Sequence, residues 1–274
     1  MFQVSRKAHA LIAAFAAILA LGAFAAGASA APANLFGVVP QAAPTQEQFD
    51  KLEQGGVQSI RTGLAWSEVQ AVRGGAYSWA GFDAMVEKAA KANIEVLPFL
   101  VSPPTWAVPL KAVPGAAGTK APARLPVSGF SATAWSSFLK AAVARYGSAG
   151  TFWSENPLVP KHPIEAWQIW NEPNFKYFIA KPNPTEYGKL VTLSSKAIKS
   201  ADPSAKVILA GLFAKPAGGR RLAGKRVANP TSPNYFASYF LEQMYKTNPG
   251  IKSRFQGVAL HPYVARYRQL PADI

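Results

Sequence analysis

The chain has 274 residues and no cysteine, which excludes disulfide bridges, thiolate metal sites and cysteine nucleophiles. Only three histidines occur, and no His-rich spacing indicates a protein metal site, so we expect none. The formal net charge is +15, but no nucleic-acid-binding motif accompanies it, and we expect no nucleic-acid partner.

The first thirty residues have the pattern of an export signal. Arg6 and Lys7 give a basic start, residues 11–26 form an apolar run, and small residues end at Ala30. We therefore predict cleavage after Ala30 and a secreted, extracellular or cell-envelope location; the alternative is a retained membrane anchor. Residues 31–274 contain no second apolar run of spanning length, so we expect no membrane span after cleavage.

Apolar runs alternate with helical patterns along the rest of the chain, which is typical of a parallel α/β fold. Thr45 and Gln48 form a capping box at the start of the first predicted helix. The long Pro/Gly-rich segment 102–129 is predicted to be a functional loop. The predicted strands are 35–39, 57–64, 94–101, 164–170, 206–212 and 255–260. The predicted helices are 45–54, 80–92, 131–146, 184–200 and about 233–247.

This alternation fits either an open doubly wound sheet or a (β/α) barrel. The first strand–helix junction lacks the Gly-x-Gly-x-x-Gly pattern of a nucleotide site, which weakens the first alternative. Polar and aromatic residues recur where four of the predicted strands end. In a barrel these ends meet at one face, where barrel active sites are built. The residues are Arg61, Trp66, Trp106, Trp170, Asn171, Glu172, His261 and Tyr263.

The segment 167–174 reads WQIWNEPN and directly follows the predicted fourth strand. It resembles the retaining glycoside hydrolases of clan A, most closely the β-xylosidase and α-L-iduronidase family or the cellulase-like family. The resemblance implies an eight-stranded TIM-type (β/α) barrel that acts on the O-glycosidic bonds of a polysaccharide or oligosaccharide. It also implies a mechanism that needs no cofactor.

The resemblance implies a role for each residue at the strand ends. Glu172 would be the general acid/base, and Asn171 would hydrogen-bond a sugar hydroxyl. Arg61 would steady the nucleophilic carboxylate. His261 and Tyr263 would line the catalytic subsite. Three tryptophans would offer flat faces to sugar rings, namely Trp66, Trp106 and Trp170. Each has a structural alternative, such as an ion pair for Glu172 or Arg61 and the hydrophobic core for a tryptophan.

A retaining mechanism needs a second carboxylate, which the resemblance places at the end of strand seven. Because six strands are predicted, we expect an incomplete barrel over 31–274, with strands seven and eight missing. The only acid after Tyr263 is Asp273. Among the earlier acids Glu68, just beyond the second predicted strand, is the least unsuitable substitute. We therefore expect this chain alone to be inactive and poorly stable. The alternative is a non-catalytic carbohydrate-binding or cell-envelope protein on the same scaffold.

The segment 215–226, from Lys215 to Arg226, contains five basic residues and no acid. It is predicted to be a solvated loop, and binding of an anionic envelope polymer is the alternative. Segments 102–129 and 213–232 carry no recognisable specificity motif. The sequence therefore predicts neither the sugar, nor the linkage, nor endo or exo action, nor the oligomeric state.

Overall fold

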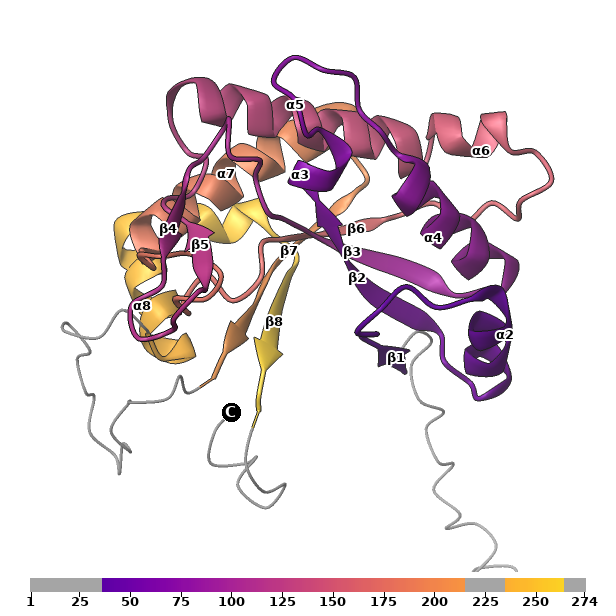
Figure 1. The fold of residues 1–274 in the computed structure, drawn as a ribbon, viewed down its shortest axis with the longest axis horizontal. Helices are drawn as coiled ribbons and strands as arrows, with labels where there is room; N and C mark the ends of the chain where they lie inside the picture. The colour runs from indigo at the N-terminus through magenta and orange to yellow at the C-terminus, as the bar shows by residue number, and fades with distance from the viewer. Residues whose placement is uncertain (1–35, 215–234, 264–274) are drawn as a thin grey trace, which may run out of the picture. The chain divides into compact units, whose positions relative to one another are not determined.

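The computed structural model describes residues 36–214 and 235–263, and Figure 1 shows their arrangement. The main sheet has parallel strands in the order β1-β2-β3-β6-β7-β8. Their bounds are β1 Gly37–Val38, β2 Ser59–Ala65, β3 Glu95–Val101, β6 Ala166–Ile169, β7 Lys206–Phe213 and β8 Gly257–His261.

The strand order separates the two folds that the sequence left open. In an open doubly wound sheet the strand order reverses at one point, and helices cover both faces. Here the parallel strands follow one another in chain order, and Figure 1 shows the sheet curling with the helices on its outer side. The described part of the chain is thus a partial TIM-barrel-like fold, as predicted.

The helices between these strands begin and end close to the predicted positions. Helix α2 (Gln46–Gln54) begins at the predicted capping box, in which Thr45 and Gln48 satisfy each other's backbone amides. Helix α7 (Pro184–Ala201) has Asn183 as its N-cap and proline in its first turn. The others are α4 (Ala80–Lys91), α5 (Gly129–Tyr146) and α8 (Ala237–Thr247).

Several short elements are absent from the sequence prediction. Within the predicted loop after β3, strands β4 (Leu110–Ala112) and β5 (Lys120–Pro122) form an antiparallel hairpin. The others are α3 (Trp66–Val69), α6 (Thr151–Glu155) and the 3-10 helix η1 (Ile251–Arg254). The three residues of β4 are exposed, so no apolar alternation marks the hairpin.

The helical layer is joined to the sheet by one large apolar core, which includes Trp135, Trp167 and Phe240. A polar cluster links α4 to α5 on the outer side of this core. Asp83 accepts two hydrogen bonds from Arg145, at 2.7 and 2.5 Å, and one from the Tyr146 hydroxyl at 2.7 Å. This bidentate ion pair fixes the helices with good geometry and partial burial.

Apolar side chains are exposed at both edges of the sheet. Among the described residues, β1 pairs only with β2, and β8 pairs only with β7. Phe36 and Val39 beside β1, and Val258 and Leu260 on β8, are all exposed. Such edges favour association with further strands.

Two sequence predictions lie outside the described residues, namely the export signal over 1–30 and the basic segment 215–226. Over residues 36–214 and 235–263, no helix is both long enough and apolar enough to cross a membrane.

Candidate active site

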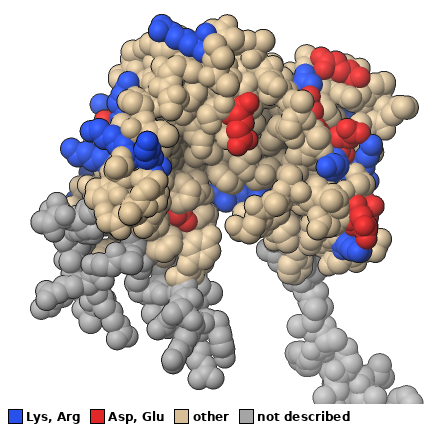
Figure 2. Space-filling model, viewed as in Figure 1, with Lys and Arg blue, Asp and Glu red and all other residues tan. Residues whose placement is uncertain are grey.

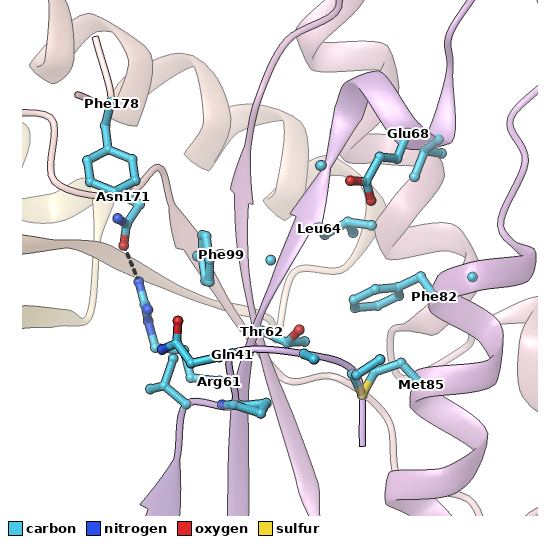
Figure 3. A pocket seen from close by; sticks show the side chains of 18 of the residues that line it. Gln41, Arg61, Thr62, Leu64, Glu68, Phe82, Met85, Phe99, Asn171 and Phe178 are labelled. Atoms are coloured by element: carbon cyan, nitrogen blue, oxygen red, sulfur yellow. Dashed lines mark hydrogen bonds between the residues drawn. The ribbon is translucent and has the colours of Figure 1, made fainter. Parts of the chain in front are cut away.

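A cavity of about 650 Å³ is lined by β2, by residues that follow β6, by the end of β8, and also by residues 39–43 and α4. This volume is within the usual range for small-molecule sites. Figure 3 shows Arg61, Asn171, Phe99 and Phe178 along one side of this cavity. Five of the predicted site residues line it together: Arg61, Asn171, Glu172, His261 and Tyr263. Chain segments up to 200 residues apart are thereby brought to one place, as the barrel prediction required.

The backbone at the end of β6 leaves regular strand geometry. Trp170 has a φ of 73° and Glu172 a φ of 41°, both in the left-handed region that non-glycine residues rarely adopt. In a regular strand, neighbouring side chains point to opposite faces. The two left-handed residues break this alternation, so the consecutive Asn171 and Glu172 both line the cavity.

Glu172 is 5% exposed and meets His261 across the sheet. Its Oε1 lies 2.6 Å from Nδ1 of His261, a distance typical of a charge-assisted hydrogen bond. The backbone amide of Glu172 donates to the carbonyl of Gly211 at 3.1 Å. A Cβ atom at Gly211 would overlap the His261 ring, so only glycine lets this ring approach β7. The register of β7 and β8 also shifts between Ile208 and Gly211.

Arg61 is held on the cavity wall by neutral partners. Its Nε donates to Oε1 of Gln168 at 2.6 Å, and its Nη2 donates to Oδ1 of Asn171 at 2.7 Å. Its guanidinium carbon lies 4.2 Å from the centre of the Phe99 ring. Burial lowers the pKa of Arg61, while negative charge at Tyr263 and Glu172 acts to raise it. Arg61 therefore orients Asn171, and its charge faces the cavity.

Two of the three predicted sugar platforms are corrected by the structure. Trp66 and Trp170 are fully buried, so their rings belong to the core and offer no face to a ligand. Trp66 stacks on Phe138, and Trp170 donates its ring N–H to the carbonyl of Phe178 at 3.1 Å. Trp106 is half-buried, packs edge-on against Trp66, and lies outside the cavity lining formed by the described residues.

Two residues that support the site were not singled out in the sequence. The side-chain oxygen of Gln168 accepts a hydrogen bond from Arg61, and its amide nitrogen donates to the carbonyl of Leu209 at 2.9 Å. Gln168 is fully buried, so it holds the arginine in place from within the sheet. Asn174 makes three hydrogen bonds with the backbones of Phe213 and Tyr235. A buried polar residue inside an apolar strand was the available signal for Gln168.

Within the described residues, the cavity lining contains two carboxylates, Glu172 and the exposed Glu68 on α3. Figure 3 shows the Glu68 side chain on the opposite side of the cavity from Asn171. Over residues 36–214 and 235–263 there is no cluster of three or more histidine or acidic side chains that could hold a metal ion.

Comparison with protein-family models and with curated proteins finds no match. Among solved structures, a family 30 endoxylanase from Clostridium papyrosolvens C71 matches with a TM-score of 0.53 and 15% identity, covering 86% of this chain and 53% of its own. A family 39 glycoside hydrolase from Bacteroides cellulosilyticus WH2 matches with a TM-score of 0.47 and 22% identity, covering 66% and 32%. A family 39 β-xylosidase from Caulobacter crescentus has a TM-score of 0.46 and 20% identity, covering 65% and 40%.

The chain thus spans between 32% and 53% of the length of these three structures. The predicted resemblance to clan A glycoside hydrolases is confirmed for the fold. At this level of identity the likeness concerns the fold alone, so the chemistry of the site rests on its own residues.

Proposed function

We propose that this chain carries the acid/base half of a retaining glycosidase, with Glu172 as the group that protonates the glycosidic oxygen. The arrangement of Glu172 supports this proposal most directly. The carboxyl group is buried, yet it lies on the wall of a cavity beside an Arg61-held asparagine. A structural carboxylate of this fold, Asp83, instead pairs directly with a cation.

The hydrogen-bond pattern of Glu172 gives each of its oxygens a different task. Oε1 is held by His261 Nδ1, which fixes the plane of the carboxyl group. Among the described residues Oε2 has no partner, so it is the oxygen that would meet the leaving group. Asn171 would hydrogen-bond a hydroxyl of the sugar next to the reacting carbon, because Arg61 already fixes its Oδ1 and leaves its amide N–H groups for a ligand.

The second carboxylate of the reaction would lie near Arg61, which forms no ion pair among the described residues and contacts two amide oxygens and an aromatic face. We place this nucleophile outside the described residues, because Glu68 lies across the cavity from Asn171 in Figure 3. Retaining enzymes hold their two carboxyl groups roughly 5 Å apart. A small external anion can therefore take the place of the missing group.

The test supplies azide to the purified chain together with aryl glycosides of several pentoses and hexoses. Azide forms a bond to the anomeric carbon as the carbon–oxygen bond breaks, and Glu172 gives its proton to the departing oxygen. We expect azide-dependent release of 4-methylumbelliferone, a leaving group that needs an acid. Glu172→Gln should reduce this rate by about 100-fold or more, in the range of a lost general acid.

A dinitrophenyl leaving group provides the internal control, because it departs without a proton. Glu172→Gln should change its azide-dependent release by less than about tenfold. Glu68→Gln, which removes the other carboxylate of the cavity lining, should change neither rate. Equal methylumbelliferone release by the wild type and Glu172→Gln would contradict the role of Glu172. Sugar binding without release from any glycoside would favour the non-catalytic alternative.

We also propose that residues 1–30 direct export of the protein and that residues 31–274 form the mature part. N-terminal sequencing of the protein recovered from a secreting host should begin at Ala31. A product that starts at Met1 in the membrane fraction would show a retained anchor instead.

A further inference from the structure

A row of aromatic rings leads away from the cavity along the loop that follows Glu172. Tyr263 lies on the cavity wall, and the centre of its ring is 5.7 Å from that of Phe213. Phe213 stacks on Phe175, with 4.9 Å between the ring centres. Phe175 in turn contacts Tyr177 edge-on at 4.9 Å. Tyr177 is 40% exposed and Tyr263 65%, so the row is open to solvent at both ends. Exposed rings of this kind can pack against the C–H faces of sugars.

The far end of this row lies against the β4–β5 hairpin. The amide of Ala180 donates to the carbonyl of Pro122 at 2.9 Å, and the Lys176 ammonium donates to the carbonyl of Pro114. The hairpin and the loop 173–183 therefore form one continuous surface beside the cavity. Each segment begins at the carboxyl end of a barrel strand, where substrate loops of this fold are built.

This surface carries cations and no acid. The segment 102–128 contains Lys111, Lys120 and Arg124, the segment 173–183 contains Lys176 and Lys181, and neither contains Asp or Glu. Over the described residues, none of Lys111, Lys120 and Lys181 forms an ion pair.

The opposite side of the molecule differs, because Lys51 and Lys91 on α2 and α4 are each paired with a glutamate four residues earlier. Figure 2 shows Lys and Arg gathered on the side where β4 and β5 lie, and mixed with Asp and Glu toward α2 and α4.

We infer that the aromatic row and the basic hairpin form an extended site for an acidic polysaccharide, whose chain runs from the cavity across Tyr263 and Tyr177 to the hairpin. This inference deepens the proposed function and rests on it for the placement of the reacting end. Rings alone would suit any sugar chain, and lysines alone would suit any polyanion. Their succession along one surface favours a ligand that has both a sugar backbone and repeated negative charge.

The experiment measures binding by calorimetry at low and high salt, with the purified chain and two matched ligands. One is a hexamer of galacturonic acid, and the other is its fully methyl-esterified form, which has the same backbone and no charge. We expect the acidic hexamer to bind at least tenfold more tightly at low salt, and this preference to shrink as salt screens the exposed cations.

The test variant carries Lys111→Gln, Lys120→Gln and Lys181→Gln. The control carries Lys140→Gln, Lys189→Gln and Lys196→Gln, which removes equal charge from exposed positions on α5 and α7. The test variant should lose about tenfold in affinity for the acidic hexamer, and the control less than twofold. Equal loss in both variants would show a general effect of net charge and overturn the inference.

A second pair of measurements separates this inference from the proposed function. Tyr177→Ala should weaken both hexamers, because it removes a ring and no charge. A twelve-residue thymidine strand should bind at least tenfold more weakly than the acidic hexamer; tighter binding of the strand would overturn the assignment to a sugar chain. Failure of azide transfer with hexamer binding intact would affect the catalytic proposal alone.

Discussion

Arg145 on α5 and Arg61 on β2 both lie largely below the surface, but they meet different partners. Arg145 forms a bidentate ion pair with Asp83 and a further contact with Glu155 at 3.1 Å. Arg61 meets two amide oxygens and one aromatic ring. The hydrogen bonds that Arg145 donates to Asp83 raise the pKa of Arg145, whereas burial lowers the pKa of Arg61.

We interpret this difference as one between a structural cluster and a candidate ligand site. Around Arg145 the chain itself supplies the opposite charge, so the interaction is complete without a ligand. Around Arg61 the described residues orient the guanidinium and leave its charge available at a cavity wall. Arg61 forms no ion pair among the described residues, although charge at Tyr263 and Glu172 acts on it across the cavity. A partly buried cation without an ion-pair partner has an energetic cost, and such a cost is common where a charged ligand is bound.

The largest effect is expected from Asp83→Ala, which leaves Arg145 and the Tyr146 hydroxyl without their shared partner. We expect the free energy of unfolding to fall by about 3 kcal/mol, as measured by urea denaturation. Glu155→Ala removes the exposed partner of the same arginine and should cost less than about 1 kcal/mol. Similar losses in the two variants would contradict the assigned difference between these carboxylates.

Gly211→Ala should destabilise the chain by about 2 kcal/mol, because the new methyl group overlaps the His261 ring. Displacement of His261 should also abolish azide-dependent release of methylumbelliferone. Gly81→Ala on α4, where a Cβ meets open space, is the matched control and should be neutral or stabilising by about 0.5 kcal/mol. An unchanged release rate in Gly211→Ala would show that the His261 contact does not position Glu172.

Arg61→Met tests the other side of the comparison. The substitution removes the cost of burying a charge, but it also leaves two amide oxygens without a hydrogen-bond donor. Because these effects oppose each other, the free energy of unfolding should change by less than about 1 kcal/mol. The azide-dependent rate should fall at least tenfold, because Asn171 loses its orientation. A loss of stability as large as that of Asp83→Ala would place Arg61 with the structural residues.

Asp202 provides the smallest and most graded test, because its partners are hydroxyl and amide groups of Ser148 and Ser204 rather than a cation. Burial acts to raise the pKa of Asp202, but these hydrogen bonds lower it from 3.8 to about 2. The folded state therefore gains stability from the ionised group above about pH 4, and loses it as the pH falls toward 2. The Asp202→Asn variant should unfold at a lower temperature than the wild type at pH 5. The two unfolding temperatures should approach each other near pH 2.

The sequence predicted those parts of the fold and site that depend on local pattern. Long apolar runs located the six parallel strands of the described residues, and Asn171 and Glu172 were found because their motif ends one of these runs. The misplacement of Trp170 has a local cause. Its φ of 73° turns the ring into the core, and no periodic pattern announces such a departure.

The remaining differences depend on contacts between distant segments. Trp66 begins the short helix α3 and packs on Phe138 of α5, so its burial is set by tertiary structure rather than by its position after β2. The β4–β5 hairpin is similarly held by the loop 173–183, whose hydrogen bonds to it join residues about 60 positions apart. Neither arrangement can be predicted from the pattern of a short sequence segment.

The left-handed backbone at Glu172 also has a consequence for laboratory evolution. A non-glycine residue in this conformation costs on the order of 1 kcal/mol, and asparagine or glycine adopts it more easily. Substitutions of Glu172 by either residue should therefore be enriched in any library that is sorted for heat resistance alone. A selection for thermal stability alone could therefore remove the carboxyl group that we propose as the acid, so a stability library should also be sorted for the proposed activity.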